Sequence, residues 1–237
     1  MENQDYIIPI FIGYDSRERA ATNVLIDSIY QNSTTPVSVI PLVKSQLESQ
    51  NLFYRKRDQN QSTEFSFTRF LVPKLMNYKG WAIFMDCDML CRTDISRLWA
   101  LRDNNKALLC VKHNHKPISN EKFLGERQTK YEKKNWSSLM LFNCAKCKNL
   151  TVEYVNKSSG LELHQFKWLN NDSEIGEIKE FGWNYLVDVQ EFPKNKSQNH
   201  KIALLHWTLG GPWFKSNEKL SEFDKYWFNA RNDSIEI

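Results

Sequence analysis

WAIFMDCDML, residues 81–90, is an apolar run that contains two aspartates separated by one cysteine. Its first five residues carry no charge, and a similar apolar run, IIPIFI, occupies residues 7–12. Such runs are typical of strands covered on both faces, as in a parallel or mixed sheet between two layers of helices. Sheets of this kind hold their ligands at the carboxyl edge of the strands. The sequence therefore predicts an α/β fold with a ligand site beside Asp86 and Asp88.

Outward from this run, the chain alternates between strand and helix patterns. It opens with a strand over 6–15, a helix over 16–33 and a strand over 36–43, which together form a β-α-β unit. Ser16 is the expected cap of that helix. Further helices are expected over 62–80, 95–103, 147–160 and 223–233, and further strands over 107–113, 136–144 and 201–207. Gly160 is expected to end the helix over 147–160.

Composition and charge argue against several classes of protein. Lys and Arg number 32 against 28 Asp and Glu, and the formal charge of +4 is too small an excess to indicate nucleic-acid binding. The N-terminus has no basic region before its short apolar run, and no stretch approaches the roughly 20 apolar residues of a membrane-spanning helix. We therefore expect a cytoplasmic protein, with peripheral membrane contact where its acceptor is bound to lipid.

The five cysteines are expected to stay reduced in that compartment. Cys144 and Cys147 form a lone CxxC pair, and a zinc site would need a second pair, for which Cys87 and Cys91 are only loosely spaced. Cys87, Cys110 and Cys144 fall in apolar, strand-like runs. Burial as small hydrophobic side chains is the favoured interpretation, and zinc binding is the alternative.

Asp86 and Asp88 carry the strongest chemical signal. Side chains at i and i+2 of an extended chain point to the same side, and two unpaired carboxylates this close repel each other in an apolar setting. A divalent cation such as Mg²⁺ or Mn²⁺ removes the repulsion and bridges to phosphate oxygens. The alternative is a chance Asp-x-Asp on a surface loop, but the apolar strand before the pair favours a metal site.

The longer stretch RFLVPKLMNYKGWAIFMDCDML, residues 69–90, resembles the centre of a glycosyltransferase with the GT-A fold. It is most similar to the retaining group that includes glycogenin and bacterial lipopolysaccharide galactosyltransferases. The resemblance implies an α/β/α sandwich with a mixed, mainly parallel central sheet. It also implies a uridine-type nucleotide-sugar donor, Mn²⁺ or Mg²⁺ as cofactor and retention at the anomeric carbon. The acceptor would be a saccharide, a lipid-linked molecule or a protein.

The resemblance assigns donor-binding roles to three residues of the first half. Arg69 stands where an arginine of the family contacts the nucleotide, and the alternative is an ordinary arginine on a helix surface. FIGYDSRE, residues 11–18, stands at the place of the family's nucleobase-contacting segment. Tyr14 is therefore a candidate for stacking on the base, and Asp15 for hydrogen bonding to it. Asp15 is alternatively a helix cap.

The second half holds the candidates for sugar contact and catalysis. NWSSLMLFN, residues 135–143, resembles the family's stretch beside the donor sugar, and Asn135 and Ser137 are the candidates there, although Trp136 replaces the family's asparagine. In the irregular segment 161–188, Gln165 suggests a counterpart of the family's Asp-Gln-Asp stretch. Aromatic rings beside polar groups suit the C–H faces and hydroxyls of a sugar, although tryptophan is equally a core residue. Further candidates in this segment are His164, Trp168, Asp172, Trp183 and Asn184.

LLHWTLGGPWFK, residues 204–215, resembles the family's C-terminal motif, in which a histidine completes the metal site and a lysine meets the diphosphate. His206 occupies the histidine position, and a purely structural histidine is the alternative. The motif is one residue shorter here, and Gly211 stands where the lysine would be. The phosphate contact is therefore assigned to the amides of Gly210 and Gly211 or to Lys215.

We expect one catalytic domain over residues 1–237. Its parts would be a nucleotide-sugar-binding half over 1–113, an acceptor-side half with the C-terminal motif over 114–215, and a closing helix over 216–237. A nucleotidyltransferase is the enzymatic rival, but it normally has a Gly-rich, basic loop after the first strand, which FIGYDSRE lacks. The other rival is a carbohydrate- or nucleotide-binding module without catalysis.

Overall fold

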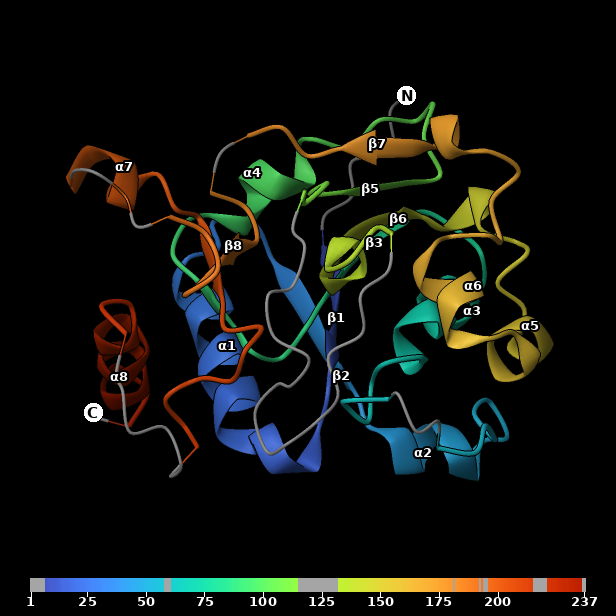
Figure 1. Cartoon of the computed structure of the whole chain (residues 1–237), viewed down its shortest axis with the longest axis horizontal. Helices are drawn as coiled ribbons and strands as arrows, with labels where there is room; N and C mark the ends of the chain where they lie inside the picture. The colour runs from blue at the N-terminus through green and yellow to red at the C-terminus, as the bar shows by residue number, and fades with distance from the viewer. Residues whose placement is uncertain are drawn as a thin grey trace.

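A six-stranded sheet forms the centre of the protein (Figure 1). The computed structural model describes residues 7–57, 61–114, 132–180, 182–191, 193, 196–214 and 221–235. The strands follow one another across the sheet in the order β2, β1, β3, β6, β5 and β7. Their bounds are β1 Ile8–Gly13, β2 Val37–Leu42, β3 Trp81–Met85, β5 Leu108–Cys110, β6 Leu139–Asn143 and β7 Ile175–Glu177.

In this sheet β6 runs against its neighbours. β1 pairs in parallel with β2 and β3, and β5 pairs in parallel with β7, whereas β6 is antiparallel to β3 and β5. The predicted mixed, mainly parallel sheet is therefore confirmed. Met85 pairs with Ile12 of β1 and with Leu139 of β6. The ends of β1 and β3 and the beginning of β6 consequently meet at one edge of the sheet.

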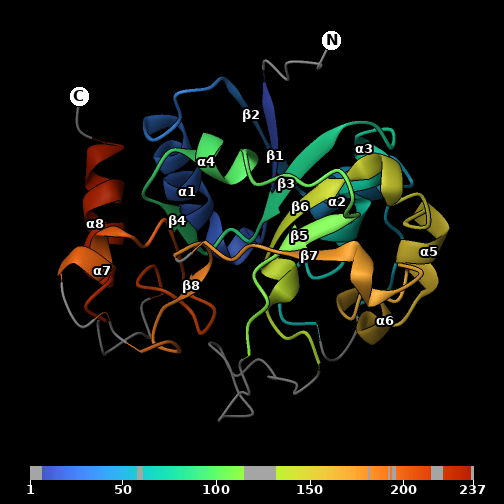
Figure 2. The same ribbon diagram turned by 90° about the horizontal axis from the view of Figure 1, so that it is seen from above.

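Helices cover both sides of the sheet (Figure 2). On one side α1 (Arg19–Gln31) and α8 (Asp224–Asp233) pack against each other, and on the other lie α3 (Val72–Leu75), α5 (Val152–Lys157) and α6 (Gly160–His164). This is the expected α/β/α sandwich. None of the described helices is both long and apolar enough to cross a bilayer. The remaining helices are α2 Lys44–Ser49, α4 Ile95–Trp99 and α7 Lys196–His200, with 3-10 helices η1 Ser16–Glu18, η2 Thr68–Leu71, η4 Trp136–Ser138, η5 Cys144–Lys146 and η6 Asp172–Glu174.

The run of residues 81–90 divides between two sheets, so the single strand predicted there is wrong. β3 ends at Met85, and β4 (Met89–Cys91) joins a second sheet in the order β4, β9 (Leu204–His206) and β8 (Tyr185–Leu186). The N–H of Asp86 donates to the Ser138 carbonyl at 2.9 Å, whereas the carbonyl of Asp88 accepts from the N–H of Trp207 at 2.9 Å. The acidic segment is therefore the crossing between the two sheets.

Two expectations about helices in the first half are wrong. Asp15, and not Ser16, caps the first helical turn, because its side chain accepts a hydrogen bond from the N–H of Arg17. The helix expected over 62–80 is reduced to η2 followed by the single turn of α3. Pro73 lies at the start of α3, where its missing N–H is tolerated, so the regular helix cannot extend backwards through it.

The expectation that Gly160 ends a helix is also wrong. α5 ends three residues earlier, and Gly160 is the first residue of α6. Ser159 and Glu162 form a capping box at this start, in which each side chain bonds to the backbone N–H of the other. The polar pair Ser158-Ser159 therefore separates two short helices.

All five cysteines are buried with free thiols, as expected of small core residues. Burial raises the pKa of Cys91, Cys110 and Cys144 to about 12. Among the described residues, one group of three or more His, Cys, Asp or Glu side chains lies close enough together to share a metal ion. It consists of Asp86, Asp88 and His206 and contains no cysteine. The described residues therefore do not support the alternative in which the cysteines bind zinc.

The end of β1 packs tightly against Phe65. A Cβ atom added at Gly13 would lie 2.3 Å from the Phe65 ring, which is itself buried. Gly13→Ala should therefore lower the free energy of unfolding, measured in urea, by about 1–3 kcal/mol, because the ring must move within a packed core. Phe65→Leu combined with Gly13→Ala should recover part of this loss. A Gly13→Ala variant as stable as the wild type would contradict the packing.

Candidate functional site

Four segments of the chain meet at the edge of the central sheet. Residues 14–18 follow β1, residues 86–88 follow β3, and residues 135–138 precede β6. His206 ends β9 and pairs with Met89, directly after the acidic segment. The register of the strands thus brings together the stretches that the sequence analysis singled out, at the carboxyl edge where such sheets bind their ligands.

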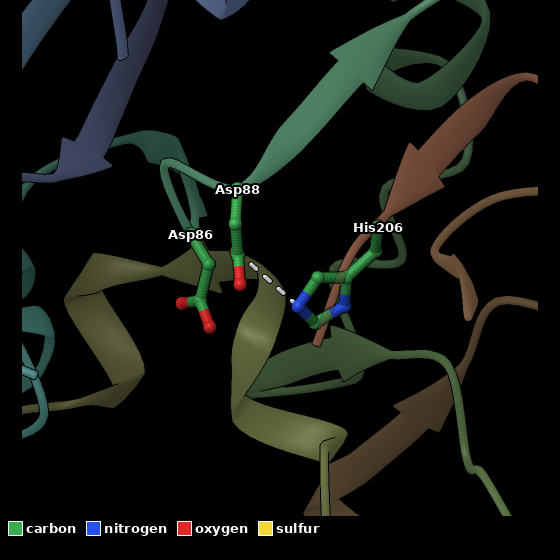
Figure 3. Close-up of side chains that lie close together, drawn as sticks. All are labelled: Asp86, Asp88 and His206. Carbon is green, nitrogen blue, oxygen red and sulfur yellow. Dashed lines mark ion pairs between the residues drawn. The ribbon is translucent and has the colours of Figure 1, made fainter. Parts of the chain in front are cut away.

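Asp86, Asp88 and His206 form a cluster at this edge. Each offers a ligand atom, and these atoms all lie within 4.8 Å of one another. Figure 3 shows the three side chains directed toward one space, with the His206 ring facing the Asp88 carboxylate. Asp88 and His206 are 7% and 1% exposed. The structure therefore assembles the three residues predicted as metal ligands.

The chemistry of this donor set fits a divalent cation. Carboxylate oxygens suit Mg²⁺ and Mn²⁺, and neutral imidazole nitrogen is a common metal ligand. Asp88 Oδ1 is buried and accepts no hydrogen bond from the described residues, and His206 Nε2 lies 3.3 Å from it. A buried carboxylate oxygen without a donor is costly, and a bound cation would remove that cost.

Arg69 contacts the cluster directly. Its Nη1 lies 2.8 Å from Asp86 Oδ1 and also donates to the Ser137 carbonyl at 2.8 Å. The side chain is buried, and its guanidinium carbon lies 5.0 Å from the centre of the Phe84 ring. Burial contradicts the alternative of an arginine on a helix surface. Contact with a nucleotide stays a prediction for Arg69.

Asp15 acts as a helix cap and a local anchor. Its Oδ1 accepts from the N–H of Arg17 at 2.9 Å, and its Oδ2 accepts from the N–H of Glu64 at 3.0 Å and pairs with the Arg17 guanidinium at 2.8 Å. Burial would raise the pKa of Asp15, but the hydrogen bonds and charge of Arg17 and the Glu64 amide hold it below its usual value. Nucleobase contacts of Asp15 and the half-buried Tyr14 stay predictions.

Glu18 is a buried carboxyl group that the sequence analysis did not single out. It is 1% exposed, its Oε2 accepts from Trp213 Nε1 at 3.2 Å, and its Oε1 has no partner among the described residues. Burial, followed by the negative charges of Asp88 and Asp15, raises the pKa of Glu18 well above its usual value. Glutamate early in a helical segment is ordinarily a surface residue, so its sequence position carried no signal.

The candidates of the second half lie around Lys133. Its Nζ lies 2.6 Å from Asp172 Oδ1 and donates to the Gln165 carbonyl at 2.9 Å. The hydrogen bond and charge of Lys133 hold the pKa of the exposed Asp172 below its usual value. Ser137 Oγ lies 2.8 Å from His164 Nδ1. Gln165 and Asp172 thus lie next to the turn before β6, and their catalytic roles stay predictions, as do those of Asn135 and Ser137.

The other three candidates of the irregular segment are deeply buried. Trp168 and Trp183 are each 2% exposed and belong to the hydrophobic core, which was the alternative for them. Asn184 is fully buried, and its Oδ1 lies 2.8 Å from His206 Nδ1. Asn184 therefore contacts the ring of a predicted metal ligand.

The turn after His206 requires glycine for local reasons. Gly210 has φ 100°, in the left-handed region, and its N–H donates to the Trp207 carbonyl at 2.9 Å. A Cβ atom at Gly211 would lie 2.2 Å from the Trp213 ring. Lys215 lies outside the described residues. Phosphate contacts from these three residues stay predictions.

Sequence comparison places this site in a family. The sequence profile described as "Glycosyl transferase family 8" matches residues 20–151, more than half of the chain. The chain belongs to glycosyl transferase family 8. The family match includes Asp86 and Asp88 and ends before His206. The chain is also 44% identical over 226 residues to Protein CDI of Arabidopsis thaliana, an alignment that covers 94% of this chain and 86% of that protein.

Solved structures share the fold at low sequence identity. The bifunctional glycosyltransferase WbbM has a TM-score of 0.62 at 16% identity, covering 96% of this chain and 50% of WbbM. GlyE of Streptococcus pneumoniae TIGR4 has a TM-score of 0.60 at 10% identity, covering 96% of this chain and 60% of GlyE. The galactosyltransferase LgtC, in complex with donor and acceptor sugar analogues, has a TM-score of 0.56 at 9% identity, covering 97% of each chain. The chain thus spans half of WbbM and 60% of GlyE, and at these identities the similarity supports the GT-A fold alone.

The lowered pKa of Asp15 predicts a pH-dependent contribution to stability. A carboxylate whose pKa is lowered by folding stabilises the protein above its unfolded value of about 3.9, and the effect is lost as the pH falls through the folded pKa. Asp15→Asn keeps an oxygen for the cap and loses the charge. It should lower the free energy of unfolding by about 1–2 kcal/mol at pH 7, and the difference from the wild type should close below about pH 4.

Urea denaturation at a series of pH values measures this difference. Asp103→Asn, at the opposite edge of the sheet, provides a charge-matched control. A difference that stays constant down to acid pH would contradict a charged anchor at Asp15.

Proposed function

We propose that the chain is a metal-dependent glycosyltransferase that moves a sugar from a uridine diphosphate donor to a saccharide, lipid-linked or protein acceptor. The observation that carries the proposal is the convergence of Asp86, Asp88 and His206 at the carboxyl edge of the sheet, in a member of glycosyl transferase family 8. The complex of LgtC with donor and acceptor sugar analogues agrees with this class of substrates.

The residues of the cluster would hold the cation and fix its place. Mn²⁺ or Mg²⁺ bound there supplies positive charge beside the diphosphate leaving group. Asp88 offers a buried oxygen without another donor, and His206 offers Nε2. Asp86 is held by Arg69 through its side chain and by the Ser138 carbonyl through its N–H. Because these groups are already ordered, little reorganisation is needed when charge develops on the leaving group.

The donor would extend from the cluster in both directions. The base would lie toward the segment after β1, and the sugar toward the turn before β6. We propose retention at the anomeric carbon and name no nucleophile. The proposed contacts are Tyr14, Asp15 and Arg69 for the nucleotide, Gly210, Gly211 and Lys215 for the diphosphate, and Asn135, Ser137, Gln165 and Asp172 for the sugar and its transfer.

We also propose that residues 1–237 act as one catalytic domain. A single hydrophobic cluster includes residues from Ile8 in β1 to Leu204 in β9, and it therefore joins the proposed nucleotide-binding half, 1–113, to the acceptor-side half, 114–215. Residues from β4, β9 and α8 share a smaller second cluster. This packing supports a closing helix that stabilises the strand carrying His206.

Nucleotide release from a panel of uridine diphosphate sugars tests the proposal. In the presence of Mn²⁺ at least one donor should release uridine diphosphate, slowly without an acceptor and faster with one. A chelator should abolish the release, because the cluster would otherwise repel the diphosphate. Asp88→Asn should lower the rate by at least about a hundredfold, since it removes one of two charged ligands.

The matched control for this test is again Asp103→Asn, which removes a carboxylate remote from the cluster and should keep the wild-type rate. Release that survives chelation, or an Asp88→Asn variant as active as the control, would contradict the metal-dependent mechanism. Formation of pyrophosphate from a nucleoside triphosphate and a sugar phosphate would instead identify a nucleotidyltransferase.

A further inference from the structure

We infer that Asn184 is a positioning residue that selects the tautomer of His206 and so turns an unprotonated ring nitrogen toward Asp86 and Asp88. The inference deepens the proposed function and rests on it for the role of the metal. It is carried by a buried chain of hydrogen bonds that runs from the turn before β6, through Ser138 and Asn184, to the ring of His206.

The direction of each hydrogen bond in this chain is fixed from its far end. The carbonyl of Asn135 can only accept, so the hydroxyl of Ser138, at 2.7 Å, must donate to it. With its proton used, Ser138 Oγ must accept from the amide of Asn184 at 2.8 Å, and that atom is therefore Nδ2. The opposite atom of the amide, Oδ1, then faces the histidine ring.

This order determines which nitrogen of His206 carries the proton. Asn184 Oδ1 is an acceptor, so His206 Nδ1, at 2.8 Å, must carry a hydrogen. In a neutral ring the other nitrogen, Nε2, then has a free lone pair. Nε2 is the atom that lies 3.3 Å from Asp88 Oδ1. The hydrogen-bond chain therefore prepares the ring as a ligand before any cation is bound.

The backbone around Asn184 is built to hold its side chain there. Asn184 has φ 55°, in the left-handed region that asparagine adopts more readily than most residues, and it is fully buried. Two residues earlier, the carbonyl of Gly182 accepts from the N–H groups of Ala203 and Leu204. The turn is thus attached to β9, the strand that carries His206, and Asn184 keeps its distance to the ring.

Ser138 connects this chain of hydrogen bonds to Asp86, on the other side of the group of predicted metal ligands. Its carbonyl accepts the N–H of Asp86 at 2.9 Å, while its hydroxyl belongs to the hydrogen-bond chain. The neighbouring carbonyl of Ser137 accepts from Arg69, which pairs with Asp86. One turn thus orders Asp86 directly and His206 through Asn184.

Nitrogen NMR of the histidine rings tests the assignment in the metal-free protein. In spectra recorded at about pH 8.5, two units above the ordinary pKa of free histidine, His206, identified by comparison with His206→Ala, should show a protonated Nδ1 and an unprotonated Nε2. Asn184→Gly keeps a residue suited to positive φ and removes the amide. It should shift the ring away from this tautomer and weaken Mn²⁺ binding, measured by calorimetry, about tenfold.

Two further variants separate positioning from a merely structural role. Asn184→Asp still accepts a hydrogen bond from Nδ1, so it should keep the tautomer. Ser138→Ala removes the acceptor that orients the amide, so it should alter the tautomer in a folded protein even if Asn184→Gly does not fold. Asn77→Gly, which replaces an exposed asparagine with φ 50°, controls for the backbone change and should alter neither measurement.

An unchanged His206 tautomer in Asn184→Gly or Ser138→Ala would overturn the inference, as would a protonated Nε2 in the wild type. A wild-type protein that shows the expected tautomer and the expected response to Asn184→Gly, yet binds no Mn²⁺ and releases no nucleotide, would refute the proposed function and leave the positioning of His206 by Asn184 supported.

Discussion

Repulsion between the buried carboxylates of Asp86 and Asp88 is the constraint around which this site is organised. Both residues are at most 9% exposed, and Glu18 adds a third buried carboxyl group that responds to the charge of Asp88. Negative charge in such a place must be balanced by nearby cations or hydrogen-bond donors. The guanidinium of Arg69 balances the charge of Asp86, and a divalent ion shared with His206 would balance the rest of the cluster.

The two sheets are what allow these groups to meet. The segment 86–88 passes from β3 of the central sheet to β4 of the second sheet, so its carboxylates lie between the beginning of β6 and the end of β9. Each partner of the acidic pair arrives from a different part of the chain: Arg69 from η2, Ser138 from η4 and His206 from β9. Loss of register in either sheet would therefore separate the cluster.

The sequence predicted the parts of this site that depend on local pattern. The apolar run before Asp86 predicted a buried strand, and the spacing of Asp86 and Asp88 predicted a metal site. The resemblance to a family motif implied that His206 completes the cluster that the structure assembles. The strand's division at the acidic segment could not be predicted, because it depends on backbone hydrogen bonds to Ser138 and Trp207, far away in the chain. Glu18 was missed for the same reason, since Trp213 is distant in sequence. Asn184 was a candidate for sugar contact, but its hydrogen bond to His206 could not be predicted. The cap of the first helical turn is a short-range feature, and its prediction was wrong by one residue: Ser16 was expected, but Asp15 is the cap.

Pulsed electron paramagnetic resonance of Mn²⁺ bound to the purified chain tests whether Asp86, Asp88 and His206 form one metal site, because it detects nitrogen atoms coordinated to the ion without any assumption about the donor or the acceptor. We expect coupling to one imidazole nitrogen in the wild type and its loss in His206→Ala, while weaker, oxygen-only binding persists through Asp86 and Asp88. Mn²⁺ that binds without nitrogen coupling, or coupling that survives in His206→Ala, would contradict a metal site built from these three residues.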